Sequence, residues 1–130
     1  MYLAVPLISN RDNTLAKAIC KILEDIGCEI ISEWVLWDDP NPNLKSEEIY
    51  RRDYQAIELC DLLVAEISKP SIGVGMEIML AKTFGKKILC LHKETPISNF
   101  LNGTPNVSTL FYSNLDDLQI KIDQNFLAKI

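Results

Sequence analysis

The chain has 130 residues, of which 48% are hydrophobic and 24% charged, and its formal net charge is −5. This length is enough for one compact core and too short for two ordinary domains, so we expect a single domain over residues 1–130. The chain has no run of Lys and Arg that could neutralise phosphates, which argues against a nucleic-acid polymer as partner.

The sequence carries no signal for a membrane or for secretion. It has no stretch of about 18 uninterrupted apolar residues, and Met1 to Pro6 lacks the basic region and cleavage site of a signal peptide. We therefore expect a cytoplasmic protein. The four cysteines are spaced without any C-x-x-C pair, so buried free thiols are favoured over disulfides or a metal site: Cys20, Cys28, Cys60 and Cys90.

The first part of the chain predicts two strands around a helix. Tyr2 to Ile8 is an apolar run of strand length, and Leu15 to Ile26 repeats apolar residues at helical spacing after a cap at Asn13. Glu29 to Glu33 reads as a second short strand. Trp37 to Asn43 contains many turn-forming residues, so a loop long enough to border a site is expected there.

The rest of the chain alternates helices and strands. Ser46 is a candidate cap for the first of these helices, in which Arg51 and Arg52 are expected to face outward. Helices are predicted at residues 47–60, 75–84 and 115–127, and strands at 62–65, 87–91 and 109–112. The unalternating apolar strands are typical of a parallel sheet covered on both faces. We therefore predict an α/β fold, a flavodoxin-like (Rossmann-like), doubly wound sheet of five parallel strands.

Ligands of such sheets bind at the carboxyl ends of the strands. There, the segment from Glu66 to Glu77 forms a Ser/Gly turn that opens a helix. In one interpretation Gly73 and Gly75 are turn residues, and Glu77 complements the positive helix end. In the other, Gly73 lets backbone N–H groups approach an anion and Ser71 donates its hydroxyl to it, while Glu77 projects into the same cleft, beside a bound sugar.

Three blocks of sequence carry a family resemblance. They are Asp53 eight residues before Asp61, the pattern P-S-x-G-V-G-x-E over residues 70–77, and Gly85 to Leu91. In this order the chain from Tyr2 through Ser98 resembles the nucleoside 2-deoxyribosyltransferase family, and within it the 2'-deoxynucleoside 5'-phosphate N-hydrolases. The resemblance implies a flavodoxin-like fold that cleaves the N-glycosidic bond of nucleosides or nucleotides without a metal or organic cofactor.

The resemblance also implies catalytic roles by motif position. Glu77 would be the nucleophile that forms a covalent deoxyribosyl intermediate, which water resolves as in a retaining glycosidase. Asp53 would be the second acid, close to the base and able to transfer a proton, and Tyr2 would orient the nucleophile or the sugar. The residue types alone also fit a solvated acid on a helix for Asp53 and a half-buried strand aromatic for Tyr2.

Phosphate binding follows from the same resemblance. Ser71 and Gly73, with Gly75 in the same loop, match positions that hold the 5'-phosphate. Ser98 lies where a serine comes from the neighbouring subunit, which implies at least a homodimer, although by itself Ser98 also fits a helix cap.

Two positions depart from the pattern of the family. After the first strand, Ser9 and Arg11 stand where the hydrolases have a Gly-Ser segment and an arginine, and they are candidates to replace those contacts. Trp34 replaces a histidine. Its ring could stack on the nucleobase or belong to the core or rim.

The leading hypothesis is hydrolysis of 2'-deoxynucleoside 5'-monophosphates to free base and 2-deoxyribose 5-phosphate. One alternative is a deoxyribosyltransferase, in which a second nucleobase resolves the Glu77 intermediate. Another is a nucleotide-binding module without turnover, since one fold hosts many functions. The sequence leaves the preferred base open.

Overall fold

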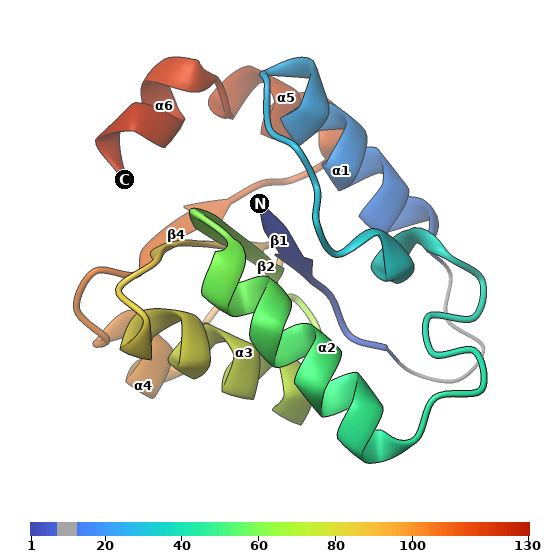
Figure 1. Ribbon diagram of the computed structural model, residues 1–130. Coiled ribbons are helices and arrows are strands. Elements are labelled where there is room, and N and C mark those ends of the chain that lie inside the picture. Colours follow the sequence, from blue (N-terminus) through green and yellow to red (C-terminus); the bar gives the residue numbers. More distant parts are fainter. Residues whose placement is uncertain (8–12) are drawn as a thin grey trace.

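A parallel sheet forms the centre of the computed structural model, which describes residues 1–7 and 13–130 (Figure 1). Four strands make up the sheet in this part of the chain: β1 (Tyr2–Ala4), β2 (Leu62–Glu66), β3 (Lys87–His92) and β4 (Ser108–Phe111). They lie side by side in the order β1-β2-β3-β4, and every neighbouring pair is parallel. The predicted parallel α/β sheet is confirmed.

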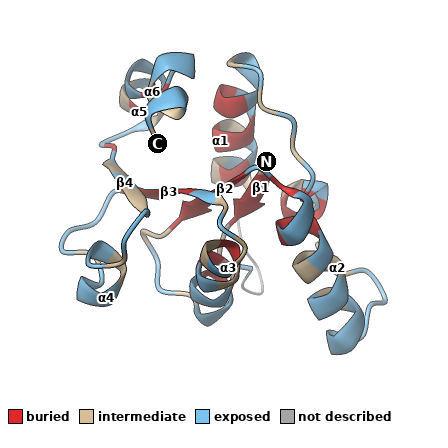
Figure 2. Cartoon of the chain, turned by 60° about the vertical axis from the view of Figure 1, so that its left-hand side comes forward, coloured by how far each residue is buried: buried red, intermediate tan, exposed pale blue. Residues whose placement is uncertain are grey.

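Helices lie on both faces of the sheet (Figures 1 and 2). One face carries α1 beside α5, and the other carries α2 beside α3. The helices are α1 (Thr14–Asp25), the 3-10 helix η1 (Glu33–Leu36), α2 (Ser46–Leu59), α3 (Ile72–Thr83), α4 (Asn99–Asn102), α5 (Leu115–Lys121) and α6 (Gln124–Lys129). No helix among the described residues is long and apolar enough to cross a membrane.

The core is the sheet itself together with the helix faces that pack on it. All five residues of β2 are buried, as are the last five of β3, and Figure 2 shows these strands in red. Leu63 and Leu89 are fully inaccessible to solvent. Burying one such leucine contributes roughly 1.5–3 kcal/mol, which explains why the strands are apolar without alternation.

The predicted strand at Glu29 to Glu33 is wrong, and residues 1–7 and 13–130 contribute four strands to the sheet where five were expected. The Met1 amino group donates to the Glu29 carbonyl oxygen and Ile31 N–H donates to the Met1 carbonyl oxygen at 2.9 Å, but the backbone pairing stops there. The Ser32 hydroxyl accepts from Leu3 N–H at 2.8 Å and donates to the Leu3 carbonyl oxygen at 3.2 Å. A side chain thus satisfies the backbone groups that a strand would have paired, and the chain turns into η1.

Three predicted boundaries also change. β1 ends at Ala4, two residues before Pro6, whose nitrogen has no proton to donate to a ladder. α3 begins at Ile72 rather than Gly75, because Ser71 caps it. The predicted helix at 115–127 is two helices, since the Asp123 carboxylate accepts from Phe126 N–H at 2.6 Å and starts α6.

Candidate active site

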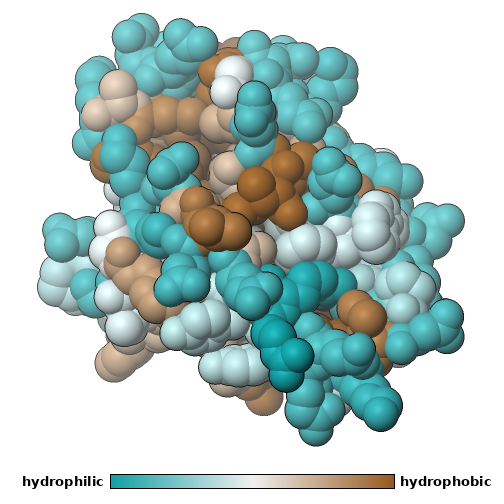
Figure 3. Space-filling model, viewed as in Figure 1, coloured by the Kyte–Doolittle hydropathy of each residue, from teal (hydrophilic) through white to brown (hydrophobic). Residues whose placement is uncertain are grey.

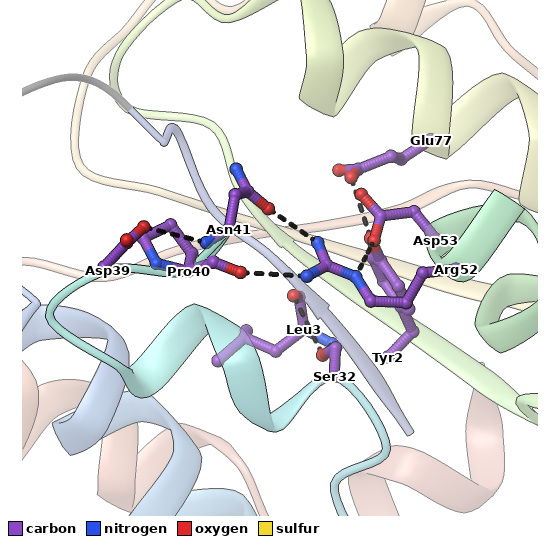
Figure 4. A network of polar contacts seen from close by, with 9 residues as sticks. All are labelled: Tyr2, Leu3, Ser32, Asp39, Pro40, Asn41, Arg52, Asp53 and Glu77. Carbon is purple, nitrogen blue, oxygen red and sulfur yellow. Dashed lines mark hydrogen bonds and ion pairs between the residues drawn. The ribbon is translucent and has the colours of Figure 1, made fainter. Parts of the chain in front are cut away.

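Three side chains from three elements meet at the centre of the site: Tyr2 of β1, Asp53 of α2 and Glu77 of α3. The Tyr2 hydroxyl donates to Glu77 Oε1 at 2.8 Å. Figure 4 shows the carboxylates of Asp53 and Glu77 turned toward each other. Both line a cavity of about 470 Å³, to which Gly73, Tyr50 and Met76 also contribute. The structure therefore brings the three predicted catalytic residues together.

Glu77 titrates near neutral pH. Burial raises the pKa of its carboxyl to about 7, the Tyr2 hydrogen bond and the Arg52 charge oppose that rise, and the Asp53 charge adds to it. A carboxyl with such a pKa changes between its neutral and ionised forms at physiological pH. Carboxyls perturbed in this way are typical of functional sites.

Tyr2 is suited to act only as a hydrogen-bond donor. Its side chain is buried, and burial together with the charges of Glu77 and Asp53 raises the pKa of the phenol far above its ordinary value. The hydroxyl therefore keeps its proton and directs it at Glu77. The ring packs edge-on against Trp34, with the ring centroids 6.2 Å apart.

Arg52 also belongs to this site, although the helical pattern predicts that its side chain faces outward. Its Nε donates to Asp53 Oδ1 at 2.8 Å. Burial raises the pKa of the Asp53 carboxyl, and the Arg52 hydrogen bond and charge act against this rise. The only signal in the sequence is that Arg52 directly precedes an acid, and it does not tell which way the side chain points.

Trp34 is largely buried, with 9% of its surface exposed. The Arg52 guanidinium lies over the indole ring, 4.1 Å from its centroid. Nucleobase stacking on Trp34 stays a prediction, and Arg52 already covers one face of the ring. The indole N–H has no hydrogen-bond partner among the residues that the structure describes.

The predicted phosphate-binding residues are divided between two cavities. Gly73 lines the cavity that contains Glu77, whereas Ser71, Gly75 and Ser98 line a second cavity of about 330 Å³. Met79 lines both. Both serines also act as helix caps: Ser71 Oγ accepts from Val74 N–H at 3.3 Å, and Ser98 Oγ accepts from Leu101 N–H at 3.4 Å. Arg11 and Ser9 lie outside the described residues.

The fold does not require glycine at position 73 or 75. Neither has a positive φ, a Cβ at Gly73 would lie 3.9 Å from Ser71 Oγ, and a Cβ at Gly75 would meet nothing within 4 Å. Glycine within a helix costs roughly 0.5–1 kcal/mol relative to alanine. Two glycines without a structural reason, in the first turns of α3, are consistent with close approach of a ligand to the backbone.

No group of three or more His, Cys, Asp or Glu side chains in the described part of the chain could hold a metal ion. The chemistry available to this site is that of a half-buried carboxylate with a fixed phenol donor and a neighbouring acid. Such an arrangement can provide a nucleophile together with a proton carrier.

Comparison with known proteins shows which family the chain belongs to. The profile of the nucleoside 2-deoxyribosyltransferase family matches residues 1–118. A protein of Thermofilum pendens named "Putative 2'-deoxynucleoside 5'-phosphate N-hydrolase 1" is 32% identical over 132 residues, which cover 95% of this chain and 92% of that protein.

Two solved structures share the fold. A CMP N-glycosidase of Clostridium botulinum superposes with a TM-score of 0.72 at 22% identity and covers 100% of both chains. A 2-deoxyribosyltransferase of Bacillus psychrosaccharolyticus has a TM-score of 0.67 at 15% identity, over 98% of this chain and 96% of its own. With the family profile across most of its length, the chain belongs to the nucleoside 2-deoxyribosyltransferase family of enzymes.

Proposed function

We propose that this enzyme hydrolyses the N-glycosidic bond of 2'-deoxynucleoside 5'-monophosphates and releases the free base and 2-deoxyribose 5-phosphate. The observation that carries the proposal is the half-buried Glu77 carboxylate, held by the Tyr2 hydroxyl at 2.8 Å and facing Asp53. The name of the Thermofilum pendens relative supports the nucleotide substrate.

In the first step, Glu77 attacks the anomeric carbon of the deoxyribose. The carbon–nitrogen bond breaks, its electron pair stays on the base, and the protonated Asp53 supplies the proton that the leaving base takes up. Burial raises the pKa of the Asp53 carboxyl, and the Arg52 hydrogen bond and charge lower it. The product of the step is an ester between Glu77 and the sugar.

In the second step, water attacks the same carbon and the ester bond breaks. Asp53, now ionised, accepts a proton from the water, and Glu77 returns to its carboxylate form. The Tyr2 hydroxyl stays protonated throughout and keeps the Glu77 oxygen in line with the sugar. The cycle consumes one water and needs no other reactant.

Phosphate recognition is proposed to come from the start of α3. The backbone at Gly73 and Gly75 leaves room for an anion, and the Ser71 hydroxyl can still donate while its oxygen caps the helix. Ser98 lines a cavity other than that of Glu77 within one chain. From the family resemblance, we propose that it acts on the Glu77 site of a neighbouring subunit in a homodimer.

The surface of α2, α3 and α4 supports such a dimer. Large apolar side chains stand exposed there: Tyr50, Leu59, Ile72, Met76, Met79 and Phe100. Figure 3 shows apolar patches open to solvent between hydrophilic side chains on one face of the molecule. Exposed apolar patches of this kind mark interaction surfaces.

The direct test is free-base release from each deoxynucleoside monophosphate and each matching nucleoside, with wild type and Glu77→Ala. Glu77-dependent release from monophosphates without any acceptor supports the proposal. Activity only on nucleosides plus an acceptor base identifies a transferase, the second candidate, which the fold shared with the Bacillus enzyme favours.

A complementation experiment tests the role of Ser98 across subunits. In a mixed dimer of Glu77→Ala and Ser98→Ala protomers, one site combines an intact Glu77 with Ser98 from the partner. Mixing the two variants restores activity if Ser98 acts in trans. If Ser98 acts in its own subunit, every site lacks one of the two residues and the mixture stays as weak as its components.

A further inference from the structure

Arg52 makes contacts that no predicted role accounts for. Each of its three guanidinium nitrogens donates one hydrogen bond: Nε to Asp53 Oδ1 at 2.8 Å, Nη1 to the Pro40 carbonyl oxygen at 2.8 Å, and Nη2 to Asn41 Oδ1 at 2.9 Å. The flat face of the group lies on Trp34, 4.1 Å from the ring centroid. Figure 4 shows the guanidinium between the loop that carries Asn41 and the carboxylate of Asp53.

These contacts join three parts of the chain that the sheet does not hold together. Asp53 is on α2, Pro40 and Asn41 belong to the loop that follows η1, and Trp34 is in η1 itself. The loop has further internal order, because the Asp39 carboxylate accepts from Asn41 N–H at 3.0 Å. The Arg52 side chain is 20% exposed, so its bonds are largely shielded from water.

We propose that Arg52 is a positioning residue: it fixes the direction of the Asp53 carboxylate toward Glu77 and ties the loop at Pro40 and Asn41 to the same site. This inference rests on the proposed function, in which Asp53 carries the proton of the leaving base. Arg52 itself touches neither the sugar nor the phosphate.

The geometry argues against Arg52 as a phosphate ligand. A guanidinium binds phosphate with two parallel N–H groups, and here three of its five N–H groups already donate to protein oxygens while the group lies over an indole. A lysine would supply the charge but neither the fork nor the flat face. The arrangement therefore uses the features that distinguish arginine.

Arg52 also sets the charge balance of the site. Its positive charge lowers the pKa of both Asp53 and Glu77 against the effect of burial. The other charged groups near it are Asp39 of the loop and, along the surface beside it, Glu48 and Arg51. Removing Arg52 leaves two facing carboxyls without the cation that touches one of them, so both should hold their protons to higher pH.

The test compares Arg52→Gln, Arg52→Lys and Asn41→Ala, with Arg51→Gln as the matched control. Arg51 is the exposed neighbour on the same helix and makes none of these contacts. We expect Arg52→Gln to lower kcat at least about tenfold. We also expect the acidic limb of the pH profile of kcat/KM to shift to higher pH by about one unit. Arg52→Lys should return the acidic limb to its wild-type pH but should not restore kcat. Asn41→Ala should lower kcat and leave the pH of the limb unchanged. Arg51→Gln should change neither quantity.

Two results would overturn the inference. An unchanged kcat and pH profile in Arg52→Gln would show that the contacts have no functional role. A rise in KM for monophosphates that is absent for nucleosides would make Arg52 a phosphate ligand.

A measurement that needs no turnover separates this inference from the proposed function. The carboxyl carbon of Asp53 can be followed by NMR during a pH titration of wild type and Arg52→Gln, with Asp53→Asn to assign the signal. We expect the Asp53 pKa to be higher in Arg52→Gln, and an equal pKa would refute the inference even if no substrate were found. Absence of Glu77-dependent base release would instead refute the proposed function alone.

Discussion

The raised pKa of the half-buried Glu77 carboxyl predicts that the site destabilises the fold at neutral and alkaline pH. Below pH 4.5 the carboxyl is protonated in both the folded and the unfolded chain. As pH rises, the unfolded chain ionises with a pKa near 4.5, whereas the folded protein holds the proton until about pH 7. The free energy of unfolding therefore falls between these values and stays low above them.

The magnitude follows from the two pKa values. A difference of about 2.5 units, at 1.36 kcal/mol per unit, corresponds to about 3 kcal/mol. Glu77→Gln removes this penalty because the amide stays neutral and its oxygen can still accept the Tyr2 hydrogen bond. We expect the variant to be up to about 3 kcal/mol more stable than wild type at pH 8 and equal to it at pH 4.

Urea unfolding followed by circular dichroism, at intervals from pH 4 to pH 9, measures this difference. The control is Glu58→Gln. It removes one negative charge, as Glu77→Gln does, but from an exposed side chain outside the site. The reasoning is refuted if the difference in the free energy of unfolding between Glu77→Gln and wild type does not grow with pH. It is also refuted if Glu58→Gln shows the same difference.

Three further predictions follow from contacts described above. Tyr2→Phe removes the bond that lowers the pKa of Glu77, so a rise of about one unit would make the loss of kcat/KM roughly fivefold larger at pH 7 than at pH 9, where only the loss of Glu77 positioning remains; a loss equal at every pH in the rate profile would contradict this. Ser32→Ala leaves Leu3 N–H and its carbonyl oxygen unpaired in a buried position, and urea titration should show a loss of about 1–3 kcal/mol. Gly27, with φ +93, follows the end of α1, so Gly27→Ala should lower the free energy of unfolding by about 1 kcal/mol. Gly75→Ala should instead raise the free energy of unfolding by up to about 1 kcal/mol and weaken nucleotide binding in calorimetry. Equal effects of the two glycine changes on stability would contradict the argument.

The sequence predicted the elements whose signals are local. Residues 62–65 and 88–91 are apolar without alternation, and they lie in β2 and β3 as expected. The motif at residues 70–77 predicted the start of the site, and the contact between Tyr2 and Glu77, 75 residues apart, followed from the family resemblance. No local pattern would have supplied that contact.

The features that sequence reasoning missed depend on tertiary contacts. A serine at position 32 reads equally well as a strand residue or a turn residue, and only the position of Leu3 decides its role. Helical periodicity places both Arg51 and Arg52 on the solvent side of α2. Only Arg51 is exposed, because the loop at Pro40 and Asn41 covers Arg52. Helical periodicity cannot predict which loop covers which face.

The hydroxyl of Ser32 also has a consequence for association between molecules. The outer edge of an open sheet is a template on which a strand of another chain can add. At Leu3 both polar backbone groups of that edge are already occupied by one side chain, and β1 is only three residues long. Next to Leu3, Ile31 N–H also occupies the Met1 carbonyl oxygen, so the edge beside β1 is closed to an added strand at both residues.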